Sequence, residues 1–337
     1  MKSENQKLLF DMIHKALPAN RALVDIVSEL LGISTDAAYR RIRCAKLIDF
    51  EEAVLLCKRF KIGLEAFVNV SDKKQITCCY NPLENSTMGS HELDLHELLY
   101  DLDNTLSAPN GEIVMSSASL SLFNFLPFQE LTFFNLYSLS SSIYSFTDNY
   151  DEFINYLDIE GLSKIYAEIV KKYNLIPSTE IWTAGVIDRM LTLICYHYEV
   201  GHFDNDNFPV LLCEELLSLL NSLQSWTEKG TKGDNNIPFK FYISEIDFDN
   251  SFILFKKEHS MKFTLKLFSI NGLTATDERF CKEIENWIYD TVQHSTLISG
   301  SSEKVRYMFF NGLKQKIRMV IDKIYQNNLN RWVTVPK

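Results

Sequence analysis

The chain has 337 residues, a length that suggests two or three domains with enough apolar content for packed cores. Its net charge of −10 argues against a protein that coats nucleic acid or an anionic membrane over its whole surface. The charge is uneven, because residues 1–70 hold 11 Lys and Arg against 9 Asp and Glu, whereas residues 71–337 hold 23 against 35. Any contact with nucleic acid is therefore expected near the N-terminus.

Apolar residues at helical spacing predict a first helix that ends before Pro18, followed by two helices joined by a short turn. Gly32 suits that turn because glycine tolerates positive φ. Ser34 can then cap the next helix, and the small Ser28 allows the two helices to approach closely. A fourth helix is predicted to begin at the capping residue Asp49, and residues 62–67 predict a short fifth helix.

The helix after the turn carries the residues that point to DNA. If its buried face is centred between Ala38 and Ile42, the helical period places Arg40 on the opposite face, where it would enter a DNA groove. The same period places Tyr39 and Arg41 at the edges, where phosphate contacts are expected. Residues 35–46 hold four cations against one anion. We therefore predict DNA contacts from Thr35, Asp36, Tyr39, Arg40, Arg41, Arg43 and Lys46.

Residues 20–70 resemble the helix-turn-helix domain of Cro and the phage repressors, which packs five helices in this order. The resemblance rests on the turn, the cap, the apolar stripe and the following helix, and it implies sequence-specific DNA binding. Two positions depart from the pattern. Arg41 occupies a position that is usually apolar, which makes the register of the helix uncertain by one residue, and Cys44 occupies the place of a helix-ending glycine.

The remaining chain predicts a helix-rich α+β half. Residues 71–90 are polar and resemble a connector, and residues 93–106 regain a helical period. Three helices are predicted over residues 151–173, 178–199 and 208–226. Alternation between residues 239 and 268 predicts an antiparallel meander of three strands, and further helices are expected from Thr276 and over residues 302–325.

Residues 113–147 contain a single charge, Glu130, together with many aromatic residues and serines. The run breaks at residues 127–130 into two pieces shorter than the roughly 20 apolar residues that span a bilayer. We therefore expect no membrane insertion and predict that the run is buried. It would line an apolar pocket, form a subunit contact or serve as plain core.

Signatures of metal and catalytic sites are weak. Seven cysteines without a Cys-x-x-Cys pattern indicate free thiols rather than disulfides or zinc, and the N-terminus lacks a signal peptide, which favours the cytoplasm. Glu199 and His202 lie one helical turn apart but have no second such pair, so we interpret them as a polar helix end. His91 and His96 are expected to be solvated. No cofactor, metal site or enzymatic activity is predicted.

The whole chain is similar to a family of largely uncharacterised bacterial regulators, in which a helix-turn-helix precedes a long α+β half. The similarity lies in residues 38–43, 123–125, 128–131, 176–182 and 295–300. It implies a helix-turn-helix DNA-binding domain over residues 1–70, a connector with a helix over residues 71–109, and a dimerisation or effector domain over residues 110–337. That last domain is expected to hold a small antiparallel sheet.

The leading hypothesis is a sequence-specific transcription regulator in the bacterial cytoplasm. Its expected partners are double-stranded DNA with an inverted repeat, a second copy of the chain, and an unidentified small-molecule effector. A homodimer is favoured because one helix-turn-helix supplies too few base contacts for genomic specificity. The final helix is one candidate for the dimer contact. An interaction protein that uses the N-terminal domain to bind another protein remains the main alternative, and an enzyme with an unrecognised site is a third.

Overall fold

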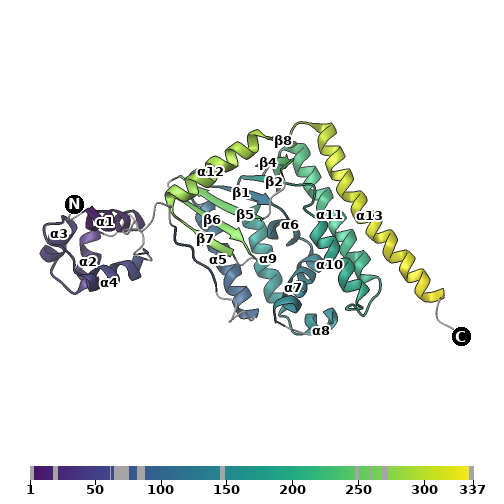
Figure 1. Ribbon diagram of the computed structural model, residues 1–337, viewed down its shortest axis with the longest axis horizontal. Helices are drawn as coiled ribbons and strands as arrows, with labels where there is room; N and C mark the ends of the chain where they lie inside the picture. The colour runs from purple at the N-terminus through teal and green to yellow at the C-terminus, as the bar shows by residue number, and fades with distance from the viewer. Residues whose placement is uncertain are drawn as a thin grey trace. The chain divides into compact units, whose positions relative to one another are not determined.

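The computed structural model describes residues 4–17, 22–60, 62–63, 76–81, 88–144, 149–246, 250–258, 260–267 and 272–333. The chain divides into two compact units, a small unit (Met1–Thr77) and a large unit (Cys78–Lys337), shown in Figure 1. Each unit has a hydrophobic core of its own.

The described helices of the small unit are α1 (Glu4–Ala16), α2 (Leu23–Leu31), α3 (Thr35–Ile42) and α4 (Phe50–Phe60). One cluster of buried side chains joins the four helices and includes Leu9, Ile13, Val27, Ala38 and Leu56. These helices lie where the sequence predicts them. Of the predicted fifth helix, residues 62 and 63 are not helical and residues 64–67 lie outside the described residues.

The large unit is built on a mixed sheet. Its described strands are β1 (Glu112–Ser117), β2 (Ser178–Trp182), β3 (Thr231–Lys232), β4 (Ile237–Ser244), β5 (Phe252–Lys257), β6 (Ser260–Lys266), β7 (Gly272–Ala275) and β8 (Ser295–Leu297). The strand order is β3-β4-β2-β1-β5-β6-β7, and β8 also pairs with β4. Strands β1, β2 and β4 are parallel, whereas β5, β6 and β7 form an antiparallel meander. The α+β class is confirmed, but the prediction of a small antiparallel sheet is wrong.

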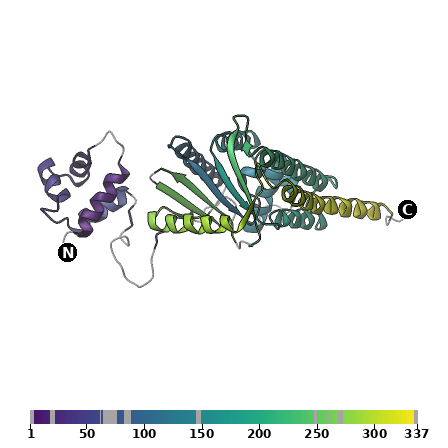
Figure 2. The ribbon, with the colours of Figure 1, turned by 90° about the horizontal axis from the view of Figure 1, so that it is seen from above.

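Helices cover both faces of this sheet (Figure 2). They are α5 (Met88–Leu106), α6 (Leu122–Phe125), α7 (Gln129–Tyr144), α8 (Tyr150–Asn155), α9 (Ile159–Tyr173), α10 (Asp188–Glu199), α11 (Phe208–Lys229), α12 (Glu278–Gln293) and α13 (Glu303–Val333). Because side chains alternate along a strand, Val114 packs with Ile288 of α12 on one face. Its neighbours Ile113 and Met115 pack into the larger core on the other face.

Strand β2 corrects the helix predicted over residues 178–199. Residues 178–182 lie between β1 and β4, and all five side chains are buried. A parallel strand covered on both faces has no alternation of polar and apolar residues, so the sequence pattern did not separate residues 178–182 from the helix that follows them. The helix itself begins only at Asp188. The predicted meander needs a similar correction, because β4 pairs with β2 and is separated from β5 by two strands.

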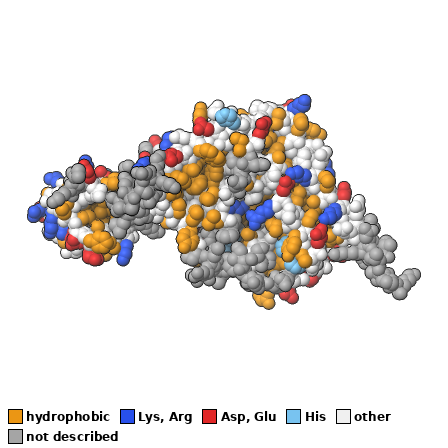
Figure 3. All heavy atoms as spheres, viewed as in Figure 1, with side chains coloured by type: hydrophobic (Ala, Val, Ile, Leu, Met, Phe, Trp, Pro, Cys, Tyr) orange, Lys and Arg blue, Asp and Glu red, His pale blue; other side chains and the backbone are white. Residues whose placement is uncertain are grey.

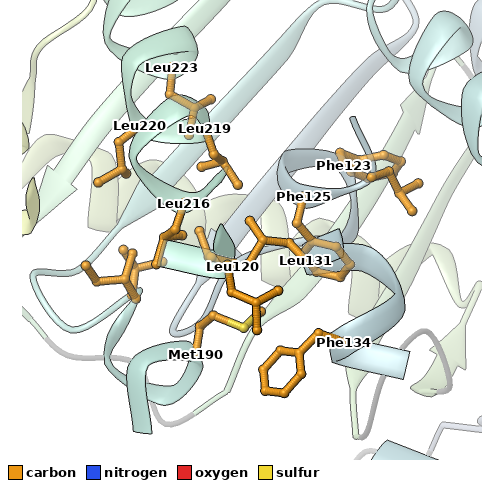
Figure 4. Packing of buried hydrophobic residues seen from close by; sticks show 14 of the residues in the cluster. Leu120, Phe123, Phe125, Leu131, Phe134, Met190, Leu216, Leu219, Leu220 and Leu223 are labelled. Atoms are coloured by element: carbon orange, nitrogen blue, oxygen red, sulfur yellow. The ribbon is translucent and has the colours of Figure 1, made fainter. Parts of the chain in front are cut away.

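Most described side chains of the charge-poor run, residues 113–147, are buried, as predicted, whereas Pro127 and Gln129 are exposed. It supplies β1, α6 and α7, and most of its aromatic residues lie in the larger core. Figure 4 shows Phe123, Phe125, Leu131 and Phe134 in the same buried cluster as Leu216, Leu219, Leu220 and Leu223 of α11. No helix in the described parts of the chain combines the length and apolar character needed to cross a bilayer.

Helix α5 belongs to the large unit, although the sequence assigned residues 71–109 to a connector. Leu95 and Leu102 are fully buried in the core of this unit, and α5 packs along α9. The ion pair between Lys262 of β6 and Asp101, with a nitrogen to oxygen distance of 2.6 Å, also ties α5 to the sheet. The apolar side chains of α5 therefore contribute to the core of the domain that was predicted to begin at residue 110.

Candidate nucleic-acid interface

A tight turn joins α2 to α3. Gly32 has a φ of 63° and lies in the left-handed region, which the sequence anticipates by placing glycine there. Ser34 caps α3 because its hydroxyl oxygen accepts a hydrogen bond from the Ala37 amide at 3.3 Å. The Ser28 hydroxyl donates to the Ile33 carbonyl at 2.8 Å. These contacts fix the direction in which α3 leaves the turn.

Helix α3 divides into a buried and an exposed face. Ala38 is fully buried in the core of the small unit, as the sequence predicts. Six of the seven residues predicted to contact DNA are exposed, namely Thr35, Asp36, Tyr39, Arg40, Arg43 and Lys46. Arg40, Arg43 and Lys46 form no ion pair with another described residue. Figure 3 shows Lys and Arg side chains at several places on the surface of this unit.

The seventh residue, Arg41, is not placed for the predicted phosphate contact. Only 6% of its surface is exposed, and its guanidinium donates to both carboxylate oxygens of Glu52 in α4, at 2.9 and 2.5 Å. A third hydrogen bond reaches the Ala37 carbonyl at 3.3 Å. Arg41 thus occupies the core-facing position that is apolar in similar helices, and it joins α3 to α4. The sequence placed Ile42 on the buried face and Arg41 at its edge, whereas in the structure Arg41 is buried and Ile42 is only partly buried.

Glu52 has two functions in this arrangement. Its amide donates to the Asp49 carboxylate at 2.8 Å, and its own carboxylate accepts from the Asp49 amide at 3.3 Å. This reciprocal cap at the start of α4 is the one the sequence predicts. The hydrogen bond from Arg41 also holds the pKa of Glu52 below its usual value. The sequence did not reveal this pairing, since the two residues lie on different helices.

Gln6 of α1 is a further residue that the sequence analysis missed. Its side-chain amide donates to the carbonyls of Arg41 at 2.7 Å and Lys46 at 2.9 Å, and its oxygen accepts from the Ile48 amide at 3.0 Å. Gln6 therefore stabilises the segment after α3. In this segment Cys44, at a position where glycine is common, has a left-handed backbone with a φ of 57°. A polar residue on the apolar stripe of a predicted helix was the available signal.

The aromatic ring of Tyr39 helps to position one of the exposed cations. The guanidinium carbon of Arg43 lies 5.6 Å from the centre of that ring, within the range of a cation–π contact. Tyr39 itself is 49% exposed. The exposed side of α3 thus carries a planar donor group held over an aromatic ring. Such a group can form two parallel hydrogen bonds to a base edge or to phosphate oxygens.

No protein-family model, curated protein or solved structure matches the chain. The surface chemistry of α3 therefore carries the functional argument.

One of the two histidines predicted to be solvated, His91, is partly buried. His91 meets the Tyr166 hydroxyl at 2.9 Å, and burial lowers the pKa of His91 to about 4. His197 and His202 face each other with their Nδ1 atoms 3.0 Å apart. Glu199 instead bonds Lys323 at 2.7 Å, and within the described ranges no group of three potential metal ligands forms. The prediction that His91 is solvated was wrong, whereas His96 is exposed and Glu199 ends α10, as the sequence predicts.

A second buried charge network lies in the core of the large unit. Glu180 of β2 and Lys232 of β3 are both fully buried. Tyr173 lies between them, because its hydroxyl donates to Glu180 at 2.5 Å while the Lys232 ammonium lies 3.2 Å from the centre of its ring. The Lys232 ammonium also donates to the Ser178 hydroxyl at 2.7 Å. Burial raises the pKa of Glu180 and lowers that of Lys232, so desolvation opposes the charged form of each side chain.

Proposed function

We propose that this chain is a sequence-specific DNA-binding transcription regulator of the bacterial cytoplasm, in which the small unit is a helix-turn-helix domain. The observation that carries the proposal is the exposed side of α3. Arg40 and Arg43 lie there without a carboxylate partner among the described residues, opposite the buried Ala38. An arginine left free in this way can donate two hydrogen bonds to a guanine in the major groove.

The remaining exposed residues fit supporting roles. Asp36, on the same side as Arg40, would accept from a base amino group, and its charge would exclude bases that present only acceptors. Thr35, Tyr39 and Lys46 lie around this centre and would contact the DNA backbone. Arg41 acts differently in this proposal. It orients α3 through Glu52 and does not touch DNA.

Specificity also supports a homodimer that binds an inverted repeat. One small domain buries too little surface to select a site among genomic competitors, and two copies on a two-fold axis double the contacts. Helix α13 offers a surface for the pairing. Val305, Met308 and Met319 are exposed on it at spacings of three and eleven residues, which place them on one side of the helix. We propose this side as the contact between copies.

A protein-contact function is favoured by a different observation. Leu47 and Phe50, just beyond α3, are 53% and 70% exposed. Exposed apolar side chains next to a small helical domain are typical of a surface that binds another protein. In that case the small unit would hold a partner protein in place of DNA.

An electrophoretic shift assay separates the two functions. The full chain is mixed with fragmented genomic DNA and an excess of nonspecific competitor, and the retarded fragments are sequenced. We expect a small set of fragments to be retained by the wild type and lost from the Arg40→Ala, Arg43→Ala double variant. The Lys58→Ala, Arg59→Ala variant removes the same charge from exposed positions of α4 and should retain them. Equal retention by both double variants would contradict the proposal.

A further inference from the structure

A cavity of about 120 Å³ lies in the large unit between α5 and the sheet. Strands β1, β5, β6 and β7 form its floor, and the start of α6 closes one side. A closed apolar cavity of roughly 150 Å³ is sufficient for benzene. This cavity is somewhat smaller but partly open, so a ring or a short alkyl chain would extend toward the opening with its substituent.

The walls of the cavity are largely apolar. Leu98 comes from α5, Phe123 from α6, and Met115, Ile253 and Phe255 from the sheet. The three sheet residues share one face, because Met115 pairs with Ile253 across the β1 and β5 ladder. A hydrocarbon group placed here would contact side chains from three directions.

A cation without a counter-charge stands at one end of the cavity. Lys266, at the end of β6, lines the cavity, and its ammonium donates to the Ser119 hydroxyl at 3.4 Å and the Leu120 carbonyl at 3.5 Å, two residues that line a small neighbouring cavity. Among the described residues it forms no ion pair. Burial and the nearby charge of Arg189 lower the pKa of Lys266 to about 8. An anion at this position would supply the counter-charge that a buried ammonium group needs.

A hydroxyl without a partner faces the same space. Ser117 is 1% exposed, and its oxygen has no hydrogen-bond partner in the described part of the chain. Strand alternation puts Ser117 on the cavity face together with Met115. Ser251 lies beside both strands, because its hydroxyl accepts from the Ala118 amide while its carbonyl accepts from the Lys266 amide. Ser117 and Lys266 both line the cavity.

The other lysine of the cavity shows that Lys266 is distinct. Lys262, which lies four residues before Lys266 in β6, is paired with Asp101 at 2.6 Å and with Glu97 at 3.2 Å. Its charge is neutralised within the protein. Only the Lys266 end is left with an excess of positive charge, so the cavity distinguishes one end of a ligand from the other.

We propose that this cavity binds a small organic monocarboxylate whose carboxylate contacts Lys266 and Ser117 and whose ring or alkyl chain lies against Met115, Phe123 and Phe255. One unpaired cation suits a single negative charge, and the carboxylates of α5 would repel a second one. Binding here does not depend on DNA binding. A role of the ligand as effector rests on the proposed function.

Ligand-observed NMR of the full chain tests the site, with benzoate as the probe and benzyl alcohol as its uncharged counterpart. We expect benzoate to bind the wild-type chain at least about tenfold more tightly, the range for a hydrogen bond to a charged group. Lys266→Met and Lys266→Gln should each remove that advantage while benzyl alcohol still binds. Lys240→Met, at an exposed lysine of β4, is the matched control and should bind benzoate as the wild type does.

The comparison of benzoate with benzyl alcohol uses the wild-type chain, so it can refute the proposal even if a variant misfolds. If benzoate binds no more tightly than benzyl alcohol, or if neither binds at millimolar concentration, the proposal is wrong. It is also wrong if both Lys266 variants bind benzoate with wild-type affinity. Because the readout is ligand binding alone, failure here is distinguishable from failure of the shift assay.

Discussion

The ion pair between α3 and α4 predicts that Arg41 contributes to stability and not to DNA contact. Arg41→Met keeps the length and flexibility of the aliphatic stem but removes three hydrogen bonds, two of them to Glu52. Removing one partner of a buried ion pair costs about 3–5 kcal/mol. The Glu52 side chain is 15% exposed and keeps its bond to the Asp49 amide, so we expect a smaller loss of about 2–4 kcal/mol.

Hydrogen exchange of the full chain, followed by mass spectrometry, measures this loss within the small unit. At about 1.4 kcal/mol for each factor of ten, amides of α3 and α4 should exchange roughly 30- to 700-fold faster in Arg41→Met. Arg40→Met is the matched control on the same helix, and because Arg40 is exposed its exchange should stay within about threefold of the wild type. Equal protection in Arg41→Met and the wild type would refute the structural role of Arg41.

Three further outcomes follow from the same contacts. The pKa of Glu52 is lowered in the folded state, so the contribution of this carboxylate to stability is present above about pH 4.3 and is lost as the pH falls through the lowered pKa. A urea series monitored by hydrogen exchange should show this loss at acid pH in the wild type and a smaller loss in Arg41→Met. Lys232→Met should lower the free energy of unfolding of the large unit by about 3–5 kcal/mol, because Glu180 stays buried and loses the positive charge of Lys232. Urea denaturation followed by tryptophan fluorescence measures this change, and a loss below about 1 kcal/mol would contradict the role of Lys232. Gly32→Ala should reduce protection of α2 and α3 by about 1–2 kcal/mol, since an added Cβ meets no atom within 4 Å and the cost is that of the left-handed backbone alone; unchanged protection would contradict that expectation.

The sequence predicted the small unit well because its signals are local. The positive φ of Gly32 and the cap at Ser34 depend on residues within a few positions of each other. The reciprocal cap between Asp49 and Glu52 is equally local. The large unit was predicted less accurately because strands β1, β2 and β4 pair across many residues of intervening chain. Parallel pairing leaves no short-range pattern in the sequence.

The errors at individual residues have a common physical origin. Arg41, His91 and Glu180 are polar, and a polar residue taken alone is expected to face solvent. Each instead packs against a partner from another element: Arg41 bonds Glu52, and His91 meets Tyr166. Glu180 accepts a hydrogen bond from Tyr173 of α9. Burial of such groups depends on the tertiary partner, which the local sequence does not identify.

The genomic binding profile of the full chain tests the central claim most directly. In cells, the cross-linked protein is recovered with its DNA, and the enriched fragments are compared with those of the Arg40→Ala, Arg43→Ala variant. The account predicts discrete sites that share an inverted repeat with half-site centres about 10 base pairs apart, and loss of these sites in the variant. A profile without enriched sites, or one that the variant leaves unchanged, would contradict DNA binding through α3.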